Sequence, residues 1–413
     1  MALSAKDIET LRKLASCYME YALSDQNNEN RELWRKLNAL NMQKPMVTIE
    51  QICWGEFSSE EFLTCTTEDS YWRSVEWDLR CAIYKWEHLR ADMVLNPYIS
   101  LARPIDDPGF GIETRALDHD KSGGFQSHLF EDQLAEMEDV EKIKTPILTL
   151  DRRKEERLLE EAQTFFAGIA PVKPQGMMLH SGLWDQITFW KGVENCYIDF
   201  MLRPELIHAI MERYTNAFLS KIDQINELGL YDITSNMCHC SYTFSDSLPD
   251  EKCDPEHPTT FDGWTFTMAQ LFTSVSPEIN KEFEVPYMSK ILSKFGSVYY
   301  GCCERLDDRL DIITQMPNIR KISCSPWNDR EHFAAILPKQ YIMSAKPNPN
   351  VLADAVFDED AVRKDLRRTI AAAKEHGLAL EFLLKDISTV RNDPSRLFRW
   401  SEIAREETIN SVL

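Results

Sequence analysis

The sequence predicts an α/β fold, a (β/α)8 TIM barrel with a helical N-terminal extension. Over the last two thirds of the chain, short apolar segments alternate with helical segments, which is typical of parallel βαβ units. About eight such units favour a closed barrel. The chain has 413 residues, so it can hold a barrel of about 250 residues together with an N-terminal part.

The predicted extension covers residues 1–88. Leu11, Leu14 and Ala15 begin an apolar repeat at helical spacing. A further helix at 71–90 is dense in tryptophan and tyrosine, and we expect it to lie against the barrel wall because large aromatic side chains dominate core packing. The catalytic barrel domain is predicted to follow at residues 89–413.

The first predicted barrel strand is the short apolar run at 92–95. After it, Pro104, Pro108 and Gly109 interrupt any helix, so we expect an irregular insertion at about residues 104–150.

The remaining elements alternate along the chain. Helix ends support the pattern, since Gly229 and Gly377 each follow the last turn of a long predicted helix. The predicted strands cover residues 176–180, 231–237, 297–302, 319–323, 341–344 and 378–384. The predicted helices cover residues 155–166, 204–228, 277–295, 306–316, 333–337, 359–376 and 394–408.

Composition excludes several classes of partner. The chain has 46 basic and 67 acidic residues and a formal net charge of −21, which argues against binding of nucleic acid. No apolar run has the length of a signal peptide or a membrane span, so we expect a cytoplasmic protein without a membrane partner. Its 11 cysteines are then expected to be reduced thiols. No glycine-rich phosphate loop and no Gly-x-Ser-x-Gly motif is present.

Reactive side chains gather at the predicted strand ends. Cys238-His239-Cys240 follows one strand and Cys302-Cys303-Glu304 follows another. Cys324, Lys346 and Lys385-Asp386 follow three more. Because the carboxyl ends of barrel strands meet at one face, we expect these groups to form one active site.

Thiolates and imidazoles at such a face predict a zinc site. Catalytic zinc uses three protein ligands and keeps a fourth position open. The predicted metal ligands are His239, Cys302, Cys303 and Cys324. The alternative is that Cys302 and Cys303 alternate, with one thiol inside the barrel and the other in its wall.

Polar groups at the same face are the predicted catalytic residues. They are Glu304, as ligand or acid and base, and Lys346, Lys385 and Asp386, which would orient the substrate. The alternative for Lys385 and Asp386 is an ion pair that fixes the last turn.

Several motifs resemble an uncharacterised branch of the uroporphyrinogen decarboxylase superfamily. The resemblance covers roughly the last two thirds of the chain and implies a TIM barrel. The motifs are Tyr300-Gly301-Cys302-Cys303-Glu304, Pro317-Asn318-Ile319-Arg320-Lys321-Ile322-Ser323, Lys346-Pro347-Asn348-Pro349 and Glu381-Phe382-Leu383-Leu384-Lys385-Asp386.

That superfamily includes zinc-dependent methyltransferases that move methyl groups between methylated substrates, corrinoid proteins and thiols. In those enzymes a His-x-Cys motif and a later cysteine hold the zinc. Here Cys302 matches the first cysteine, and Tyr300 stands at the histidine position and joins the predicted catalytic residues.

The resemblance implies a methyltransferase or demethylase that acts on a small methylated substrate. A corrinoid protein would be the methyl donor or acceptor, and it would be a separate partner because no corrinoid-binding domain is apparent in this chain. One alternative is a decarboxylase or lyase on a small carboxylate substrate, in which Lys346 or Lys385 stabilises negative charge. Another is a non-catalytic partner subunit, and homodimer formation is left open.

Overall fold

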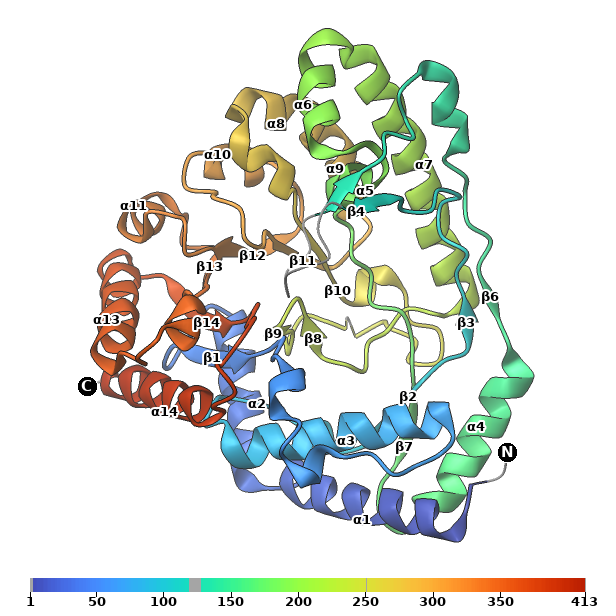
Figure 1. Cartoon of the computed structure of the whole chain (residues 1–413), viewed down its shortest axis with the longest axis vertical. Coiled ribbons are helices and arrows are strands. Elements are labelled where there is room, and N and C mark those ends of the chain that lie inside the picture. Colours follow the sequence, from blue (N-terminus) through green and yellow to red (C-terminus); the bar gives the residue numbers. More distant parts are fainter. Residues whose placement is uncertain (1–2, 119–127, 250, 413) are drawn as a thin grey trace.

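The centre of the molecule is a six-stranded parallel sheet that curls like half a barrel (Figure 1). The computed structural model describes residues 3–118, 128–249 and 251–412. The strand order is β1-β14-β13-β12-β11-β10, and every neighbouring pair is parallel. The strands are β1 Met46–Ile49, β10 Trp264–Thr267, β11 Ser297–Tyr300, β12 Ile319–Cys324, β13 Ile342–Ala345 and β14 Ala379–Leu384. The mixed α/β class predicted from the sequence is confirmed.

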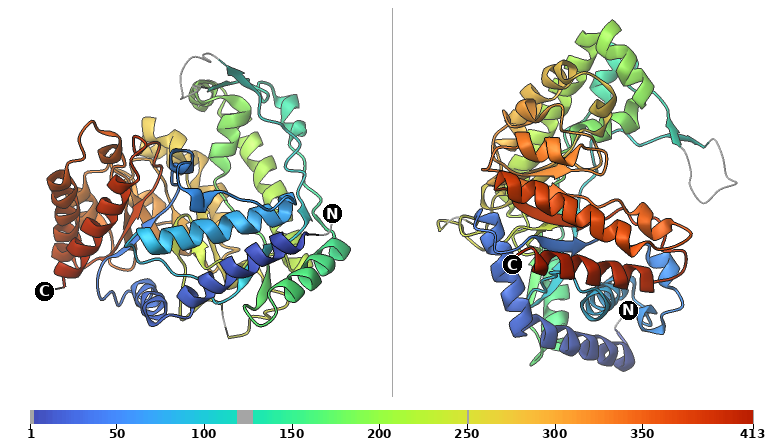
Figure 2. Two further views of the ribbon diagram at one scale, coloured as in Figure 1. Left: turned by 60° about the horizontal axis from the view of Figure 1, so that its bottom comes forward. Right: turned by 90° about the vertical axis from the view of Figure 1, so that its left-hand side faces the viewer.

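Helices surround this sheet. They are α1 Ala5–Ala22, α2 Asp25–Asn38, α3 Ser70–His88, α4 Arg152–Phe165, α5 Leu183–Lys191, α6 Val193–Leu202, α7 Pro204–Leu228, α8 Pro277–Phe283, α9 Val285–Leu292, α10 Leu310–Ile313, α11 Arg330–Ile336, α12 Asn350–Ala353, α13 Glu359–His376 and α14 Ser395–Asn410. Helices α1 and α3 run side by side in both views of Figure 2, with Leu11 and Trp72 in their shared core.

Local sequence signals define the ends of the long helices. The Asp358 side chain accepts a hydrogen bond from Ala361 N and caps α13, and Gly377 ends that helix at a φ of 64°. Helix α7 begins with Pro204 and ends before Gly229, whose φ is 61°. The predicted helices at 204–228 and 359–376 are therefore confirmed.

The two faces of the sheet differ in character. On the outer face, Val298, Ile322 and Phe382 pack in one apolar core with residues of the surrounding helices. On the inner face, buried polar groups pair with one another: Lys321 Nζ lies 2.8 Å from Glu381 Oε2. Alternation along each strand therefore decides which side chains can reach the interior.

The first 88 residues are not purely a helical extension. Met46–Ile49 forms β1, which pairs with β14 and is part of the central sheet. The prediction missed it because all four residues are buried, so the polar and apolar alternation that identifies a strand is lacking.

The predicted strand at 92–95 is not a regular strand. Its backbone groups are satisfied by side chains instead: Asn27 exchanges hydrogen bonds with both the N–H and the carbonyl of Leu95, at 2.7 and 2.9 Å, and Tyr242 OH accepts from Val94 N. These bonds replace the sheet partner that a strand would need.

The predicted strands at 176–180 and 231–237 are likewise reduced to fragments. Parallel bridges join Met177 to Tyr231 and His180 to Phe266. A closed eight-stranded barrel is therefore not confirmed by the regular strands of the described residues.

The remaining short elements lie outside the central sheet. The paired strands are β2 Ile99–Ala102 with β7 Val172–Gln175, β3 Ile105–Asp106 with β6 Thr149–Leu150, β4 Ala116–Asp118 with β5 His128–Phe130, and β8 Met237–Cys238 with β9 Ser241–Tyr242. The 3₁₀ helices are η1 Trp54–Phe57, η2 Glu61–Leu63, η3 Met137–Lys142, η4 Thr260–Asp262 and η5 Gln270–Ser274. The predicted insertion at about 104–150 contains β3 to β6 and η3, and its residues 119–127 lie outside the described part. Among the helices of the described residues, none has the length and apolar character needed to cross a membrane.

Candidate active site

A tight turn after β11 presents the two adjacent thiols. Gly301 has a φ of 94°, a region that residues with a Cβ rarely adopt. A Cβ at this position would also lie 2.7 Å from Leu306 Cδ1 and 2.9 Å from Ser323 Cβ. Glycine is therefore required here, and the turn that it makes directs Cys302 and Cys303 away from the line of the strand.

The carboxylate of Glu304 holds this turn together from behind. Glu304 is buried, and its Oε2 accepts a hydrogen bond from Cys302 N at 2.7 Å. Its other oxygen accepts from Ala269 N at 3.3 Å, at the end of the neighbouring strand. The predicted catalytic residue Glu304 is thus engaged with backbone groups and positions the thiols.

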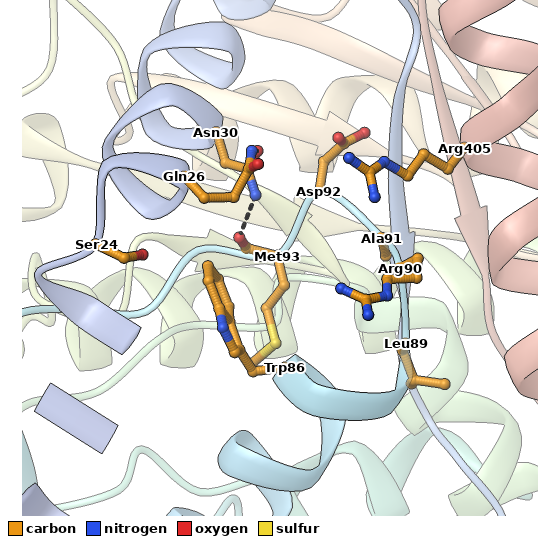
Figure 3. A pocket seen from close by; sticks show the side chains of 10 residues that line it. All are labelled: Ser24, Gln26, Asn30, Trp86, Leu89, Arg90, Ala91, Asp92, Met93 and Arg405. Atoms are coloured by element: carbon orange, nitrogen blue, oxygen red, sulfur yellow. Dashed lines mark hydrogen bonds between the residues drawn. The ribbon is translucent and has the colours of Figure 1, made fainter. Parts of the chain in front are cut away.

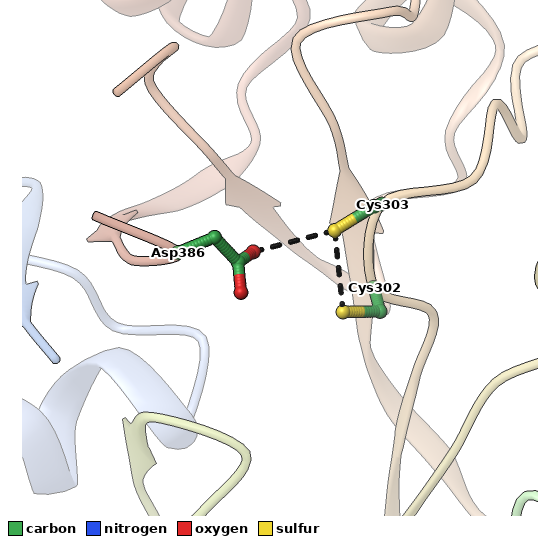
Figure 4. A group of neighbouring side chains, drawn as sticks. All are labelled: Cys302, Cys303 and Asp386. Carbon is green, nitrogen blue, oxygen red and sulfur yellow. Dashed lines mark hydrogen bonds between the residues drawn. The ribbon is translucent and has the colours of Figure 1, made fainter. Parts of the chain in front are cut away.

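Two thiols and one carboxylate form a compact group (Figure 4). Cys302 Sγ lies 3.5 Å from Cys303 Sγ, and the Cys303 thiol donates to Asp386 Oδ2 at 3.3 Å. One potential ligand atom of each residue lies within 4.8 Å of the other two. Asp386 was predicted as a substrate-orienting group, and the structure brings it to the thiols after β14.

Two lysines flank the first thiol. Lys385 Nζ donates to Cys302 Sγ at 3.0 Å and lies 3.3 Å from Asp386 Oδ2. Lys346 Nζ donates to the Cys302 carbonyl oxygen at 2.8 Å and to Ser323 Oγ at 2.7 Å. Lys385 therefore contacts the sulfur directly, whereas Lys346 fixes the backbone that carries it.

These contacts shift the pKa values of the Cys302 and Cys303 thiols in opposite directions. The hydrogen bond from Cys303 lowers the pKa of Cys302 to about 6, aided by the charges of Lys346 and Lys385 and opposed by burial. The same hydrogen bond, together with burial, raises the pKa of Cys303. Burial opposes the charge on Lys385, but the Cys302 thiolate and Asp386 outweigh it and raise the pKa of Lys385. The pair therefore holds one thiolate, centred on Cys302, and one protonated thiol.

His239 approaches this group without joining it. Its Nε2 lies 3.5 Å from Lys346 Nζ, and its ring stacks on Phe266 at 4.3 Å between centroids. Burial, followed by the nearby lysine charges, lowers the pKa of His239 well below its usual value, so the imidazole is neutral. His239 and Asp386 both have positive φ values, of 46° and 56°, a strained conformation that clusters at functional sites.

Two predicted site residues lie on the opposite face of the sheet. Tyr300 points into the outer core, where its hydroxyl donates to both oxygens of Glu284 at 2.9 Å. Cys324 is fully buried in that same core, and burial raises the pKa of its thiol to about 12. Both follow from the pleat, since their strand neighbours Tyr299 and Ser323 occupy the inner side. The structure therefore does not bring Tyr300 or Cys324 to Cys302.

The sequence analysis missed one acidic residue near the thiols. Asp185 lies in the first turn of α5, and burial raises its pKa to about 7, with a further contribution from the negative charges of Glu304 and Cys302. A carboxyl group that titrates near neutral pH can exchange protons in catalysis. No motif marked it, because it belongs to a helix and not to a strand end.

Comparisons with known proteins gave matches among solved structures alone. The sequence matches no protein-family model and no curated protein. Among solved structures, a methyltransferase from Methanosarcina mazei aligns with 91% of this chain and 97% of its own, at 12% sequence identity and a TM-score of 0.47. The function proposed below rests on the residues of this chain.

Proposed function

We propose that the protein is a methyltransferase or demethylase that acts on a small methylated substrate, with Cys302 at the centre of the reaction. The observation that carries this proposal is the Cys302 sulfur, which lies 3.5 Å from Cys303 Sγ and accepts a hydrogen bond from Lys385 Nζ at 3.0 Å, contacts that lower the pKa of the thiol. A thiolate next to an ammonium group suits the handling of an electrophilic methyl group. The resemblance to the methyltransferases of the uroporphyrinogen decarboxylase superfamily supports the same reaction class.

The donor set of this site fits zinc. Cys302, Cys303 and Asp386 offer two sulfurs and one carboxylate, which are zinc ligands, and three protein ligands leave the fourth position for a substrate. We therefore propose these three residues as the ligands, in place of the predicted His239 and Cys324. When bound, zinc would supply Lewis acidity that keeps a thiol deprotonated at neutral pH. Lys385 would still donate its hydrogen bond to the Cys302 sulfur and offset its charge.

The corrinoid protein belongs to the proposal as a separate partner. It would deliver or accept the methyl group at the carboxyl end of the sheet, where Cys303 is partly exposed and Asp386 is exposed. The support for this partner is the resemblance stated above.

We further infer that the half-barrel is closed by irregular segments. The parallel bridge from Phe266 to His180 and the bridge from Met177 to Tyr231 continue the sheet beyond β10. On the other side, Asp92 N donates to Val47 O at 2.9 Å and continues it beyond β1. The two continuations meet where the side chain of Asn96 donates to Thr234 O at 3.0 Å. A crystal structure in which these segments do not adjoin would contradict the closed barrel.

The contacts of Lys346 and Lys385 support a decarboxylase or lyase less well than a methyltransferase. That chemistry needs an ammonium group free to stabilise developing negative charge on a substrate. Lys346 is engaged with backbone carbonyls and Ser323, and Lys385 is engaged with Cys302 and Asp386. The contacts therefore favour methyl transfer.

Metal analysis combined with a methyl-donor screen tests the proposal. Protein purified without chelator should contain about one zinc per chain, and Cys302→Ser and Asp386→Asn should lose it, whereas Cys324→Ala on the outer face should retain it. Methylated amines, methoxyaromatics and methylated thiols are then tested with and without a corrinoid protein. Turnover by metal-free protein would remove the zinc role, and absence of methyl transfer from every donor would overturn the function.

A further inference from the structure

A second site is suggested by a cavity of about 290 Å³ at the other end of the sheet (Figure 3). Its wall combines α2, α3, α14 and the segment 89–93. Asp92 is bonded to Val47, the second residue of β1, so the cavity lies near the amino end of the parallel strands. Cys302 follows the carboxyl end of β11. The cavity is therefore separate from the candidate active site.

Two arginines converge on this cavity from different elements. Arg90 follows α3, and Arg405 belongs to α14. In Figure 3 both guanidinium groups point across the cavity toward α2 and Trp86. Neither guanidinium has a hydrogen-bond or ion-pair partner among residues 3–118, 128–249 and 251–412. The chain as a whole has a net charge of −21, so the two arginines make this cavity differ in charge from the protein as a whole.

The one carboxylate in the wall is already neutralised. Lys44 Nζ donates to both carboxylate oxygens of Asp92 at 2.7 Å, and Val47 N donates to one of them at 2.8 Å. The rest of the wall is neutral and includes Trp86 and Met93. The cavity thus offers two free cations beside an apolar surface.

Hydrogen bonds hold the wall in place. Asn30 Nδ2 donates to Met93 O at 2.9 Å, as drawn in Figure 3, and Trp34 Nε1 donates to Asp92 O at 2.7 Å. Arg90 N donates to Ser401 Oγ at 3.0 Å and ties the segment to α14. The Trp86 ring is supported on one side by the ring of Tyr21, at 5.9 Å between centroids. The backbone of the wall is fixed in this way, so a ligand would mainly have to order the side chains of Arg90 and Arg405.

We propose that this cavity binds a small organic anion. Its carboxylate or phosphate group would accept hydrogen bonds from Arg90 and Arg405, because guanidinium groups match planar and tetrahedral oxyanions with paired donors. Its apolar body would pack against Trp86 and Met93. The volume is at the lower end of the range for small-molecule pockets, so the ligand is smaller than a dinucleotide. This site does not depend on the reaction at Cys302.

Calorimetric titration of the full chain tests the proposal. The probes are phenyl phosphate, benzoate and inorganic phosphate, with benzylamine as a cation of similar shape. The two aromatic anions should bind, inorganic phosphate should bind more weakly because it lacks the apolar body, and benzylamine should not bind. Affinity should fall as salt concentration rises.

Substitutions then locate the binding site. Arg90→Gln and Arg405→Gln should each weaken binding of phenyl phosphate by about tenfold or more, and the double variant should abolish it. Arg153→Gln is the matched control, because Arg153 is exposed on α4 outside the cavity. Circular dichroism should show that all variants are folded. Binding that survives in the double variant, or absence of binding by both aromatic anions, would overturn the proposal.

Discussion

The two faces of the sheet at β11 and β12 carry the same residue types in opposite environments. On the outer face, Tyr300 and Cys324 lie in the apolar core beneath the helices. On the inner side, Tyr299 pairs with Ser344, and Cys302 emerges beside two lysines. Burial is nearly complete in all four residues. The difference shows that charged and hydrogen-bonding partners, and not burial, decide which side chain becomes reactive.

The thiols of Cys302 and Cys324 show this difference most clearly. Cys324 has no compensating hydrogen bond to its sulfur among the described residues, so burial dominates and raises the pKa of the thiol to about 12. Cys302 experiences burial too, yet Cys303 and the lysines reverse the effect and bring its pKa to about 6. At neutral pH one sulfur is an anion and the other is a small apolar group.

Removal of the inner thiol should have the largest effect. Cys302→Ser should lower kcat/KM for methyl transfer by about 100-fold or more, because it removes the sulfur that Lys385 contacts and whose pKa is lowered. Cys324→Ala should leave kcat/KM within about twofold of the wild type. Steady-state kinetics on the methyl donor found in the screen measures both. Equal losses of kcat/KM in the two variants would contradict the proposed difference between the inner and outer faces.

Glu284, which is buried on the outer face, should make the free energy of unfolding depend on pH. Burial raises the pKa of Glu284 to about 7, although Asn280 and Tyr300 donate hydrogen bonds to it. The folded state therefore holds this proton more tightly than the unfolded state, whose pKa is near 4.5. Its stabilising contribution is complete below pH 4.5 and is lost as pH rises to about 7, by up to about 3 kcal/mol.

Urea unfolding of the wild type and Glu284→Gln from pH 4.5 to pH 8 measures this loss. The wild type should lose stability relative to Glu284→Gln as the pH rises, since glutamine does not titrate. Tyr300→Phe should extend the loss to higher pH, because it removes a donor that favours the charged carboxylate. A constant difference between wild type and Glu284→Gln would show that Glu284 keeps an ordinary pKa.

Removal of the Lys385 charge should lower the reactivity of the Cys302 thiol. In chelator-treated protein, Lys385→Met should raise the pKa of Cys302 and slow its alkylation by iodoacetamide at pH 7 by about tenfold. Peptide mapping by mass spectrometry follows Cys302 separately from the other cysteines. Lys374→Met, on the exposed side of α13, serves as the control. An unchanged rate profile in Lys385→Met would mean that Cys303 and Lys346 set the reactivity of Cys302 without Lys385.

The smallest expected effect is structural. Cys324→Ala should cost about 1 kcal/mol of unfolding free energy, since it removes one buried sulfur from a packed core. Thermal unfolding monitored by circular dichroism measures the change. A cost near zero would indicate that the core around β12 is loosely packed.

The sequence predicted β11 to β14 and the residues that follow them better than it predicted the directions of the side chains. A continued pleat would place Cys302 on the same side as Val298 and Tyr300. Gly301, with its positive φ, interrupts the pleat and turns Cys302 inward. Asp386 reaches the thiols for a similar reason, because its own φ is positive. Such local reversals depend on the packed surroundings, so alternation in the sequence cannot predict them.

The segment 92–95 was predicted as a strand and is irregular for a different reason. Segments such as 92–95 receive their hydrogen bonds from Asn27, Trp34 and Tyr242, which are remote in the sequence. The periodicity of apolar residues predicts strands that pair through their backbones. It does not indicate where remote side chains satisfy the backbone groups instead. Metal-ligand spacing was equally uninformative, because Asp386 joins Cys303 only in the folded chain.

The pairing of β1 with β14 has a consequence for synthesis of the protein. Met46 leaves the ribosome well before its neighbour Glu381, because the two residues lie far apart in the sequence. The edge of β1 that faces β14 therefore stays unpaired until β14 has been made. A nascent chain that stalls before β14 would expose that edge to other chains, so synthesis of β14 is the step that protects it from aggregation.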